Sequence, residues 1–476
     1  MEKLCRFLYD QGRSESDIWI AGLSLYPSGG IILKKIKALF LVILTVAVLI
    51  TAAYPAHAFD KDILISDYVE EFSLKTKCSA VSVAIVQDGG SELIGDTDGL
   101  YQIGSLTKAF TGLGIQKLIG GGIINEDDKV SKWLPGFTAY YGSDPFDITI
   151  EQLLTHTSGY TNKEVDYPSA QDDMTLMEWA DSINGRRLSF EPGTRYAYSN
   201  VNYNLLGAVI ESASGISYKE YMETEVLLPL GLKNTYVEVL SENVSIIPGS
   251  RLGYLNSFAY EIPVVPGKIP AGYFYSNAKD MARWLQIWMG IADIPDEYKD
   301  LVNRVKENLG DSADYYSGWE LFESGTIGHS GGTPNYSSRI VFSDKRQIGV
   351  CVLTNMNVAA STDSLCDGIY TLCDGGNSGN IQMDVWTVFD MIFTFVTVVG
   401  ILLIVFSICI KKRSALIVTE LVLIILLIAI CVMIPMIFGA ELGTIIITWA
   451  PYSFIGGLLM LCAAIISIAI KLWIIK

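Results

Sequence analysis

The chain has 476 residues, of which 50% are hydrophobic, and its mean hydropathy of +0.35 is too high for a purely soluble protein of average composition. Its formal net charge of −17 argues against nucleic acid or anionic lipid headgroups as partners. The apolar excess lies in segments near the two ends of the chain.

The N-terminal segment, residues 1–58, resembles an export signal. Lys34, Lys35 and Lys37 precede a long apolar run, which is followed by an Ala-x-Ala site ending at Ala58. A basic region, an apolar region and a small-residue site in this order are typical of a signal peptide. The region before Lys34 is long for such a signal, so either translation starts further downstream or the segment stays as an uncleaved anchor. In both cases the chain after residue 58 is expected to cross the membrane.

Residues 59–384 are expected to form a sheet with a helical region inserted into it. A β-branched run at 78–95, broken at Asp88-Gly89-Gly90, predicts a hairpin, and residues 326–356 predict two or three more strands with Asp344-Lys345 in a turn. Helices lie between, and Gly231 predicts a helix stop. Three helix starts match a capping box: Thr149 with Gln152, Thr175 with Glu178, and Ser217 with Glu220.

A serine and a lysine three residues apart, Ser105 and Lys108, open an apolar stretch. A serine hydroxyl is a poor nucleophile unless a base lies within hydrogen-bond reach and donors await the developing oxyanion. Residues i and i+3 share a helix face, so the lysine amine is expected beside the hydroxyl. Burial on an apolar helix would lower the lysine pKa toward a value useful for proton transfer.

The same spacing recurs at Ser276 and Lys279, where the context differs. Asp280 and Arg283 lie on the following turn, so Lys279 is expected to be solvated or ion-paired. Ser276 is interpreted as a helix N-cap, which is the common role of serine at a helix start. Spacing alone therefore does not identify a nucleophile.

Histidines and cysteines give no sign of a metal site or cofactor. His156 lies at the end of the helix that begins near Thr149 and is interpreted as a structural histidine, and His57 falls in the signal region. Too few histidines remain for a zinc site. The exported cysteines have no metal-like spacing, and a disulfide such as Cys366 to Cys373 stays open; these residues are Cys78, Cys351, Cys366 and Cys373.

Residues 385–476 are predicted to form three transmembrane helices. Segments 391–410 and 421–440 carry no charge over 20 residues each, and a third apolar run covers 442–470. The basic cluster at 411–413 joins the first two spans and should be cytoplasmic, which places the preceding domain outside. Asp390 and Glu420 lie near span ends, where they are expected to reach the headgroups. The prediction is a multi-pass protein of the cell membrane with an extracytoplasmic domain.

Two further motifs come after the first serine motif in order: Tyr198-Ser199-Asn200 and His329-Ser330-Gly331-Gly332. With them the sequence resembles the serine β-lactamase and penicillin-binding-protein superfamily, in particular its class C β-lactamase, DD-carboxypeptidase and esterase-like branch. The resemblance covers nearly all of residues 59–384, including 153–160, 271–285 and 350–357. It implies an α+β fold: an antiparallel sheet flanked by helices, plus an all-helical subdomain.

The resemblance also implies a role for each motif residue. Ser105 would be the acylated nucleophile and Lys108 its proton-relay partner. Tyr198 would be a general base that later protonates the leaving group, if the lysine ammonium lowers its pKa well below about 10. Asn200 would bind the substrate amide. The remaining residues would bind substrate at a strand edge (His329, Ser330 and Gly331) or form the oxyanion hole with their backbone N–H groups (Ser105 and Gly332).

The third motif departs from the Lys-Thr-Gly of many β-lactamases. A lysine there holds a permanent charge that attracts a substrate carboxylate, whereas His329 is expected to be mostly neutral at pH 7. This weakens the expectation of β-lactamase activity without weakening that of serine hydrolysis. Tyr273, where relatives often carry glycine, is expected to narrow the cleft.

The sequence therefore predicts a membrane-anchored serine hydrolase that works through an acyl-enzyme and needs no metal or cofactor. Its substrates would be small molecules or peptides, namely an amide, a cell-wall-like peptide, an ester or a β-lactam. One alternative is a catalytically silent penicillin-binding-like receptor or component of a membrane complex. Another makes the spans a transporter or channel with an accessory domain, but the spans hold few polar residues. Protein partners of the spans are not assigned.

Overall fold

The computed structural model describes residues 65–475 except 162–172, 239–243 and 311–312. The predicted export signal and the boundary at residue 58 therefore lie outside the described residues. All the described residues belong to one compact unit, Phe59–Lys476.

A seven-stranded sheet organises the N-terminal four fifths of this unit. Its strand order is β2-β1-β13-β12-β11-β10-β9, and every neighbouring pair is antiparallel. The first strand therefore pairs with the last, as predicted for a sheet closed by the two ends of the domain. The strands are β1 (Val81–Gln87), β2 (Gly90–Ile94), β9 (Tyr315–Tyr316), β10 (Trp319–Leu321), β11 (Ile327–Thr333), β12 (Tyr336–Ser343) and β13 (Ile348–Thr354).

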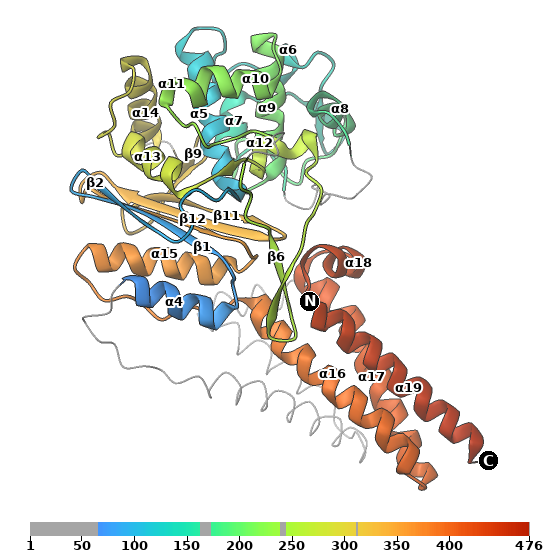
Figure 1. Cartoon of the computed structure of the whole chain (residues 1–476). Helices are drawn as coiled ribbons and strands as arrows, with labels where there is room; N and C mark the ends of the chain where they lie inside the picture. Colours follow the sequence, from blue (N-terminus) through green and yellow to red (C-terminus); the bar gives the residue numbers. More distant parts are fainter. Residues whose placement is uncertain (1–64, 162–172, 239–243, 311–312, 476) are drawn as a thin grey trace, which may run out of the picture. The chain divides into compact units, whose positions relative to one another are not determined.

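Helices cover both faces of the sheet (Figure 1). Two of them, α4 (Ile65–Thr76) and α15 (Ala359–Cys373), lie together on one face, and the helical region lies on the other. Every residue of β12 and β13 is buried, because both faces of these strands are covered. One hydrophobic core fills each side of the sheet, with Phe72 and Ile369 on the α15 side and Phe110 on the other.

The helical region is built around α5 and α9, which have 14 and 15 residues. Three two-stranded sheets lie outside the main sheet: β3 (Tyr101–Gln102) with β8 (Tyr275–Ser276), β4 (Ala139–Tyr141) with β5 (Asp144–Phe146), and β6 (Ser250–Gly253) with β7 (Asn256–Ala259). The helices are α5 (Thr107–Gly120), α6 (Val130–Trp133), α7 (Ile150–Leu154), α8 (Leu176–Ser182), α9 (Asn200–Ser214), α10 (Tyr218–Met222), α11 (Leu228–Leu230), α12 (Ile269–Gly272), α13 (Ala278–Trp288) and α14 (Asp296–Asn308).

Several local predictions are confirmed. β1 and β2 form the hairpin that turns at residues 88–89, and β11, β12 and β13 are the three C-terminal strands. Thr149 and Thr175 form complete capping boxes, and the Ser217 hydroxyl accepts the backbone N–H of Glu220. Gly231 ends α11 with a left-handed φ of 70°. These starts and stops are local chemistry, which explains why the sequence reveals them.

One local prediction is wrong, and one cysteine pairing that the sequence left open is not formed. Ser276 is not an N-cap, because it lies in β8 and its hydroxyl bonds with that of Thr235, while Asn277 caps α13 through the N–H of Asp280. Cys366 and Cys373 are separate thiols. Both lie on α15, where seven residues correspond to a rise of about 10 Å, which no disulfide spans.

Within the described residues, three helices are long and apolar enough to span a membrane: α16 (Val385–Cys409), α17 (Arg413–Phe438) and α19 (Tyr452–Ile474). The third begins ten residues later than the apolar run, because α18 (Leu442–Thr444) and a π-helical turn, η5 (Ile445–Trp449), form a separate corner before Pro451. The expectation that Asp390 reaches the headgroups is wrong, since its side chain is buried.

Candidate active site

Ser105 lies where a short 3₁₀ turn, η1 (Gly104–Leu106), runs into α5. Gly104 has a φ of +52°, and a Cβ at this position would overlap the backbone nitrogen of Gly332 on β11. Only glycine permits this approach, because it has no Cβ and adopts positive φ without strain. The serine turn therefore packs directly against the strand that carries the third motif.

Lys108 lies one turn further along α5 and is fully buried. Its Nζ is 2.9 Å from Oγ of Ser105, 2.7 Å from Oδ1 of Asn200 and 2.5 Å from the carbonyl oxygen of Ala271. Burial lowers the pKa of the Lys108 amine well below its ordinary value. The two carbonyl-type oxygens can only accept hydrogen bonds, so they take both N–H groups of a neutral amine. Its lone pair is then left for the hydroxyl proton of Ser105.

The second serine motif lacks this arrangement. Ser276 is fully buried and bonds with Thr235. Lys279 instead extends to the exposed carboxylate of Asp98, with Nζ 2.5 Å from Oδ1. The structure thus separates the two Ser-x-x-Lys motifs by the contacts of their lysines.

Tyr198 and Asn200 approach the same amine from the start of α9, where Ser199 occupies the N-cap position. The Nζ of Lys108 is 4.9 Å from the centroid of the Tyr198 ring. Burial raises the pKa of Tyr198 above its ordinary value, although a side-chain hydrogen bond with Ser105 opposes the rise. The direction is opposite to the expected one, because burial outweighs the hydrogen bond with Ser105. The same burial also disfavours the ammonium form of Lys108, which would stabilise a phenolate.

Aromatic rings surround Tyr198. The centroids of the His156 and Tyr315 rings lie 4.5 Å and 6.0 Å from that of Tyr198. Nδ1 of His156 accepts a hydrogen bond from Nδ2 of Asn202 on α9, at 2.7 Å. His156 therefore holds the first turn of α9 in place, which agrees with the structural role predicted for it.

His329 is buried on β11, and both of its ring nitrogens have partners. Nδ1 donates to the carbonyl oxygen of Ser330 at 2.6 Å, so Nε2 accepts the hydroxyl of Tyr315 at 3.0 Å. Burial lowers the pKa of His329 to about 3. The ring is therefore neutral at pH 7, as expected, and bonds within the protein.

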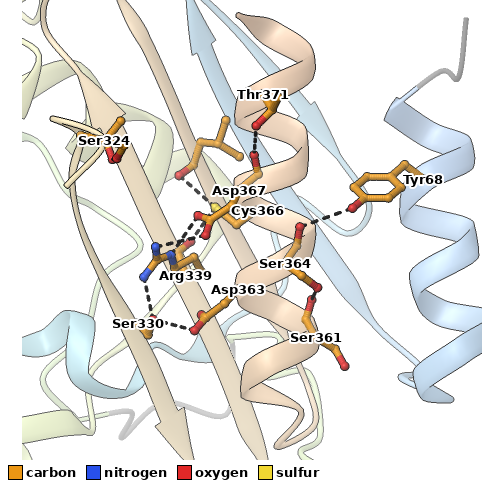
Figure 2. Close-up of polar contacts among 12 residues, drawn as sticks. Tyr68, Ser324, Ser330, Arg339, Ser361, Asp363, Ser364, Cys366, Asp367 and Thr371 are labelled. Carbon is orange, nitrogen blue, oxygen red and sulfur yellow. Dashed lines mark hydrogen bonds and ion pairs between the residues drawn. The ribbon is translucent and has the colours of Figure 1, made fainter. Parts of the chain in front are cut away.

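The Ser330 side chain points to the opposite face of the sheet, toward α15 (Figure 2). Its Oγ donates to Oδ2 of Asp363 at 3.0 Å and accepts from Nη1 of Arg339 at 2.8 Å. Arg339 also pairs with Asp367, with Nε 3.2 Å from Oδ1. Burial raises the pKa of the Asp363 carboxyl to about 6. These contacts fasten β11 to α15.

The two glycines of the third motif face different surroundings. A Cβ on Gly331 would overlap the Ser338 hydroxyl and the carbonyl oxygen of Ile103, whereas one on Gly332 would have only the Asn357 amide, at 4.0 Å. Because it has no side chain, Gly331 allows β11 to pack directly against the η1 turn that carries Ser105. Gly332 is exposed, and its backbone nitrogen lies against Gly104, the residue before Ser105.

The site includes groups that sequence reasoning missed. Tyr315 comes from the two-residue strand β9, and the carbonyl of Ala271 receives the Lys108 amine. Asp363 lies 33 residues beyond Ser330. No motif contains these groups. The role of a backbone carbonyl cannot be predicted from sequence, because every residue has one. In the described parts of the chain, no three His, Cys, Asp or Glu side chains gather as a metal site.

Most of residues 59–384 match a known family. The family model described as beta-lactamase matches residues 65–367. The chain belongs to the beta-lactamase family. This confirms the resemblance indicated by the three motifs. The site therefore belongs to a protein of a serine-hydrolase superfamily.

Among curated relatives, the protein Flp of Staphylococcus aureus (strain MRSA252) is 33% identical over 271 residues, which are 54% of this chain and 53% of Flp. Penicillin-binding protein 4* of Bacillus subtilis (strain 168) is 32% identical over 271 residues, 52% of this chain and 58% of that protein. The chain thus matches somewhat more than half the length of these relatives.

Two solved structures share the fold. The octameric penicillin-binding protein homologue from Pyrococcus abyssi aligns with a TM-score of 0.56 and 23% identity, over 69% of this chain and 80% of that one. The β-lactamase/D-alanine carboxypeptidase from Pseudomonas syringae aligns with a TM-score of 0.54 and 16% identity, over 62% and 94%. The predicted fold, an antiparallel sheet with helices and a helical subdomain, is confirmed.

Proposed function

We propose that this chain is a membrane-anchored serine hydrolase that forms an acyl-enzyme on Ser105. One observation carries the proposal: the buried Lys108 amine lies 2.9 Å from the Ser105 hydroxyl while two oxygens occupy its N–H groups. A neutral amine so placed is a general base for the hydroxyl.

In the acylation step, the Ser105 oxygen attacks the acyl carbon while its proton passes to the Lys108 amine. The backbone N–H groups of Ser105 and Gly332 stabilise the oxyanion that forms. The acyl–leaving group bond then breaks, and the leaving group takes a proton from Tyr198, which Lys108 reprotonates. In this role Tyr198 starts as a phenol, in agreement with its raised pKa. A water molecule repeats the sequence on the acyl-enzyme and releases the acid.

The substrate class is an activated acyl compound: an amide, a peptide, an ester or a β-lactam. Asn200 holds the Lys108 amine through its Oδ1, and we propose that it also positions the substrate amide. His329, Ser330 and Gly331 would support the β11 edge along which the substrate lies. His329 is neutral and supplies no fixed positive charge for a substrate carboxylate. This favours esters and peptides over acyl donors whose carboxylate must be bound by such a charge.

Acylation is tested by intact-mass analysis of the full-length protein in detergent, after incubation with an activated ester and, separately, with a fluorescent penicillin. We expect an adduct on the wild type and none on Ser105→Ala. Ser276→Ala is the matched control, because it removes the serine of the other Ser-x-x-Lys motif, and its adduct should persist.

The decay of the adduct distinguishes the two candidate functions. Release of the acid with turnover identifies a hydrolase, whereas a stable adduct identifies a penicillin-binding receptor. An adduct that survives in Ser105→Ala, or no adduct with either donor, contradicts the proposal.

A further inference from the structure

A carboxylate in the first membrane-spanning helix accepts hydrogen bonds from protein groups on both of its oxygens. Asp390 lies in the second turn of α16 and is 1% exposed. Its Oδ1 accepts the backbone N–H of Tyr254 at 2.8 Å and the hydroxyl of Ser453 at 2.6 Å, and its Oδ2 accepts the N–H of Leu255 at 2.7 Å. A buried carboxylate is costly without such donors. Two of the three come from the catalytic domain.

The two amides belong to the turn of the β6–β7 hairpin. Tyr254 and Leu255 have φ values of +54° and +62° and lie between the paired residues Gly253 and Asn256. A two-residue turn with positive φ at both positions normally carries Asn and Gly, because larger residues are strained there. Such strain persists where the surroundings enforce it, and here the Asp390 carboxylate binds both amides.

The body of the hairpin also contacts the spans at the ends where α16 and α19 begin. Nη2 of Arg251 and the hydroxyl of Tyr260 both lie 2.6 Å from the carbonyl oxygen of Ile447, in the corner before α19. The Arg251 guanidinium lies over the rings of Tyr260, at 4.0 Å, and Tyr452, at 5.5 Å. Figure 1 shows the hairpin extending away from the sheet toward α16 and α18.

The other end of the hairpin is bound to the strand that bears the proposed oxyanion donor. Nδ2 of Asn335 donates to the carbonyl oxygen of Tyr260 at 2.8 Å, and Oδ1 of Asn335 accepts the hydroxyl of Thr333 at 3.2 Å. Thr333 ends β11 and comes directly after Gly332. A short series of hydrogen bonds therefore links the cleft to the spans.

The hairpin exposes apolar side chains beside the spans. Tyr254, Leu255 and Phe258 are 44%, 50% and 42% exposed. Aromatic residues of this kind gather at membrane–water interfaces, where their rings lie at headgroup level. Trp386 and Tyr452 stand at the first turns of α16 and α19, on the same side of the bundle.

We propose that the β6–β7 hairpin rests in the membrane interface, fixed to the spans by Asp390, and holds the cleft against the bilayer so that the enzyme takes acyl donors tethered to lipid. The substrate part of this inference rests on the proposed function. Asp390 is a positioning residue, since it contacts the hairpin and not the cleft. A lipid tether confines the donor to the surface and raises its effective concentration at a cleft held there.

The test uses the full-length protein in phosphatidylcholine nanodiscs and one activated ester in two forms, free in water and joined to a phospholipid headgroup. We expect the wild type to prefer the tethered ester by at least about tenfold in kcat/KM. Asp390→Ala should lose that preference and keep its kcat/KM for the free ester within about twofold. Arg251→Ala, which breaks a second hairpin contact, should act in the same direction if Asp390→Ala does not fold.

Glu420→Ala is the matched control, because it removes the other carboxylate of the spans, on α17. Its preference should equal that of the wild type. Equal rates for the two esters in the wild type, or an equal loss of both in Asp390→Ala, would overturn the substrate inference.

A measurement without turnover keeps this inference separate from the proposed function. A nitroxide at Asn256→Cys, in a chain with Cys5, Cys373, Cys409, Cys431 and Cys462 replaced by serine, should be relaxed strongly by a nickel chelate on lipid headgroups. The same label at Ser91→Cys on β2 reports on the body of the domain and should be relaxed weakly. Equal relaxation at the two positions would show that the hairpin does not lie in the membrane interface. This result does not depend on whether either ester reacts.

Discussion

Burial acts on Lys108 and Tyr198 in opposite directions. It lowers the pKa of the amine and raises that of the phenol, so burial favours the uncharged form of both side chains. The proton of Ser105 therefore has a free lone pair to move to, and Tyr198 holds a proton for the leaving group. The two residues depend on each other for proton transfer, although not through the ammonium–phenolate pair that the sequence suggested.

Asp363 makes a pH-dependent contribution to stability. Its pKa is raised from 3.8 to about 6, so the folded protein binds this proton more tightly than the unfolded chain does. The stability that this group contributes is full below pH 4 and is lost as the pH rises toward 6. Asp363→Asn should therefore gain stability relative to the wild type between pH 4 and 7, by at most about 3 kcal/mol. Thermal unfolding in detergent at several pH values measures the difference.

Asp367→Asn is the control for this prediction. It removes a carboxylate from the same Arg339, but at a position that is half exposed. Its difference from the wild type should change little over the same pH range. If the two variants show the same pH dependence, the effect does not originate in the burial of Asp363.

The site residues that could be predicted from the sequence are those that belong to a motif. The spacing of Ser105 and Lys108, together with two later motifs, placed the candidate nucleophile and base, and the structure brings them to 2.9 Å. Asp363, Arg339 and Tyr315 were not predictable, because their contacts depend on how α15 and β9 meet β11. The pKa direction of Tyr198 was missed because it depends on burial, which a motif does not reveal.

At the scale of secondary structure, the contact between η1 and β11 determines where the nucleophile lies. The 3₁₀ turn carries Ser105, and β11 carries Gly331 and Gly332. The absence of side chains at Gly104 and Gly331 lets the two elements touch. Small shifts between them would separate the hydroxyl from the oxyanion donors, to which catalysis is sensitive.

Gly331→Ala tests this packing. Its Cβ would overlap Ser338 and Ile103, so we expect a loss of about 1–3 kcal/mol in stability and a slower acylation of Ser105. Gly332→Ala is the matched control, because its Cβ meets open space and its N–H is retained, and its stability should change by less than about 0.5 kcal/mol. Thermal unfolding and adduct formation measure both variants. Equal effects of the two substitutions would show that the overlap is relieved at little cost.

Elements with turn or cap signals were predictable, and the shortest strands were not. The β1–β2 hairpin and the capped starts of α7 and α8 arise from turn and cap residues. β9 has two residues and β10 three, too few for any periodicity to show. The start of α13 was displaced by one residue because Ser276 and Asn277 are both good caps, and the pairing of β8 with β3 decides between them.

At the scale of the whole molecule, charges distinguish the two ends of the span bundle. Lys411 and Lys412 follow the C-terminus of α16, and Lys471 lies in the last turn of α19, at the ends remote from the sheet. At the other end of the bundle, Asp384 precedes α16 and Glu441 precedes α18. Positive residues favour the cytoplasmic side of a membrane. This supports a catalytic domain on the extracytoplasmic side.

Cys409 provides a test of this orientation, since it lies exposed at the remote end of α16. In right-side-out membrane vesicles, a membrane-impermeant maleimide should modify Cys409 only after permeabilisation. Ser91→Cys, exposed on β2, should be modified at once. Peptide mass spectrometry resolves the two sites, and the reverse order of labelling would place the domain in the cytoplasm.

The three spans were predictable from their apolar length, but their contact with the catalytic domain was not. Asp390 looked like an ordinary charge near a span end, because sequence does not show that the β6–β7 turn reaches it. Contacts between elements far apart in the chain require the folded arrangement.

The attachment of Tyr254 and Leu255 to Asp390 limits how such proteins can be recombined. A catalytic domain fused to foreign spans would carry a strained turn whose two amides had lost their acceptor, and the original spans would keep an unpaired carboxylate. Both halves of a chimera would be destabilised, although each motif remained intact. The hairpin and the first span are therefore expected to be inherited together.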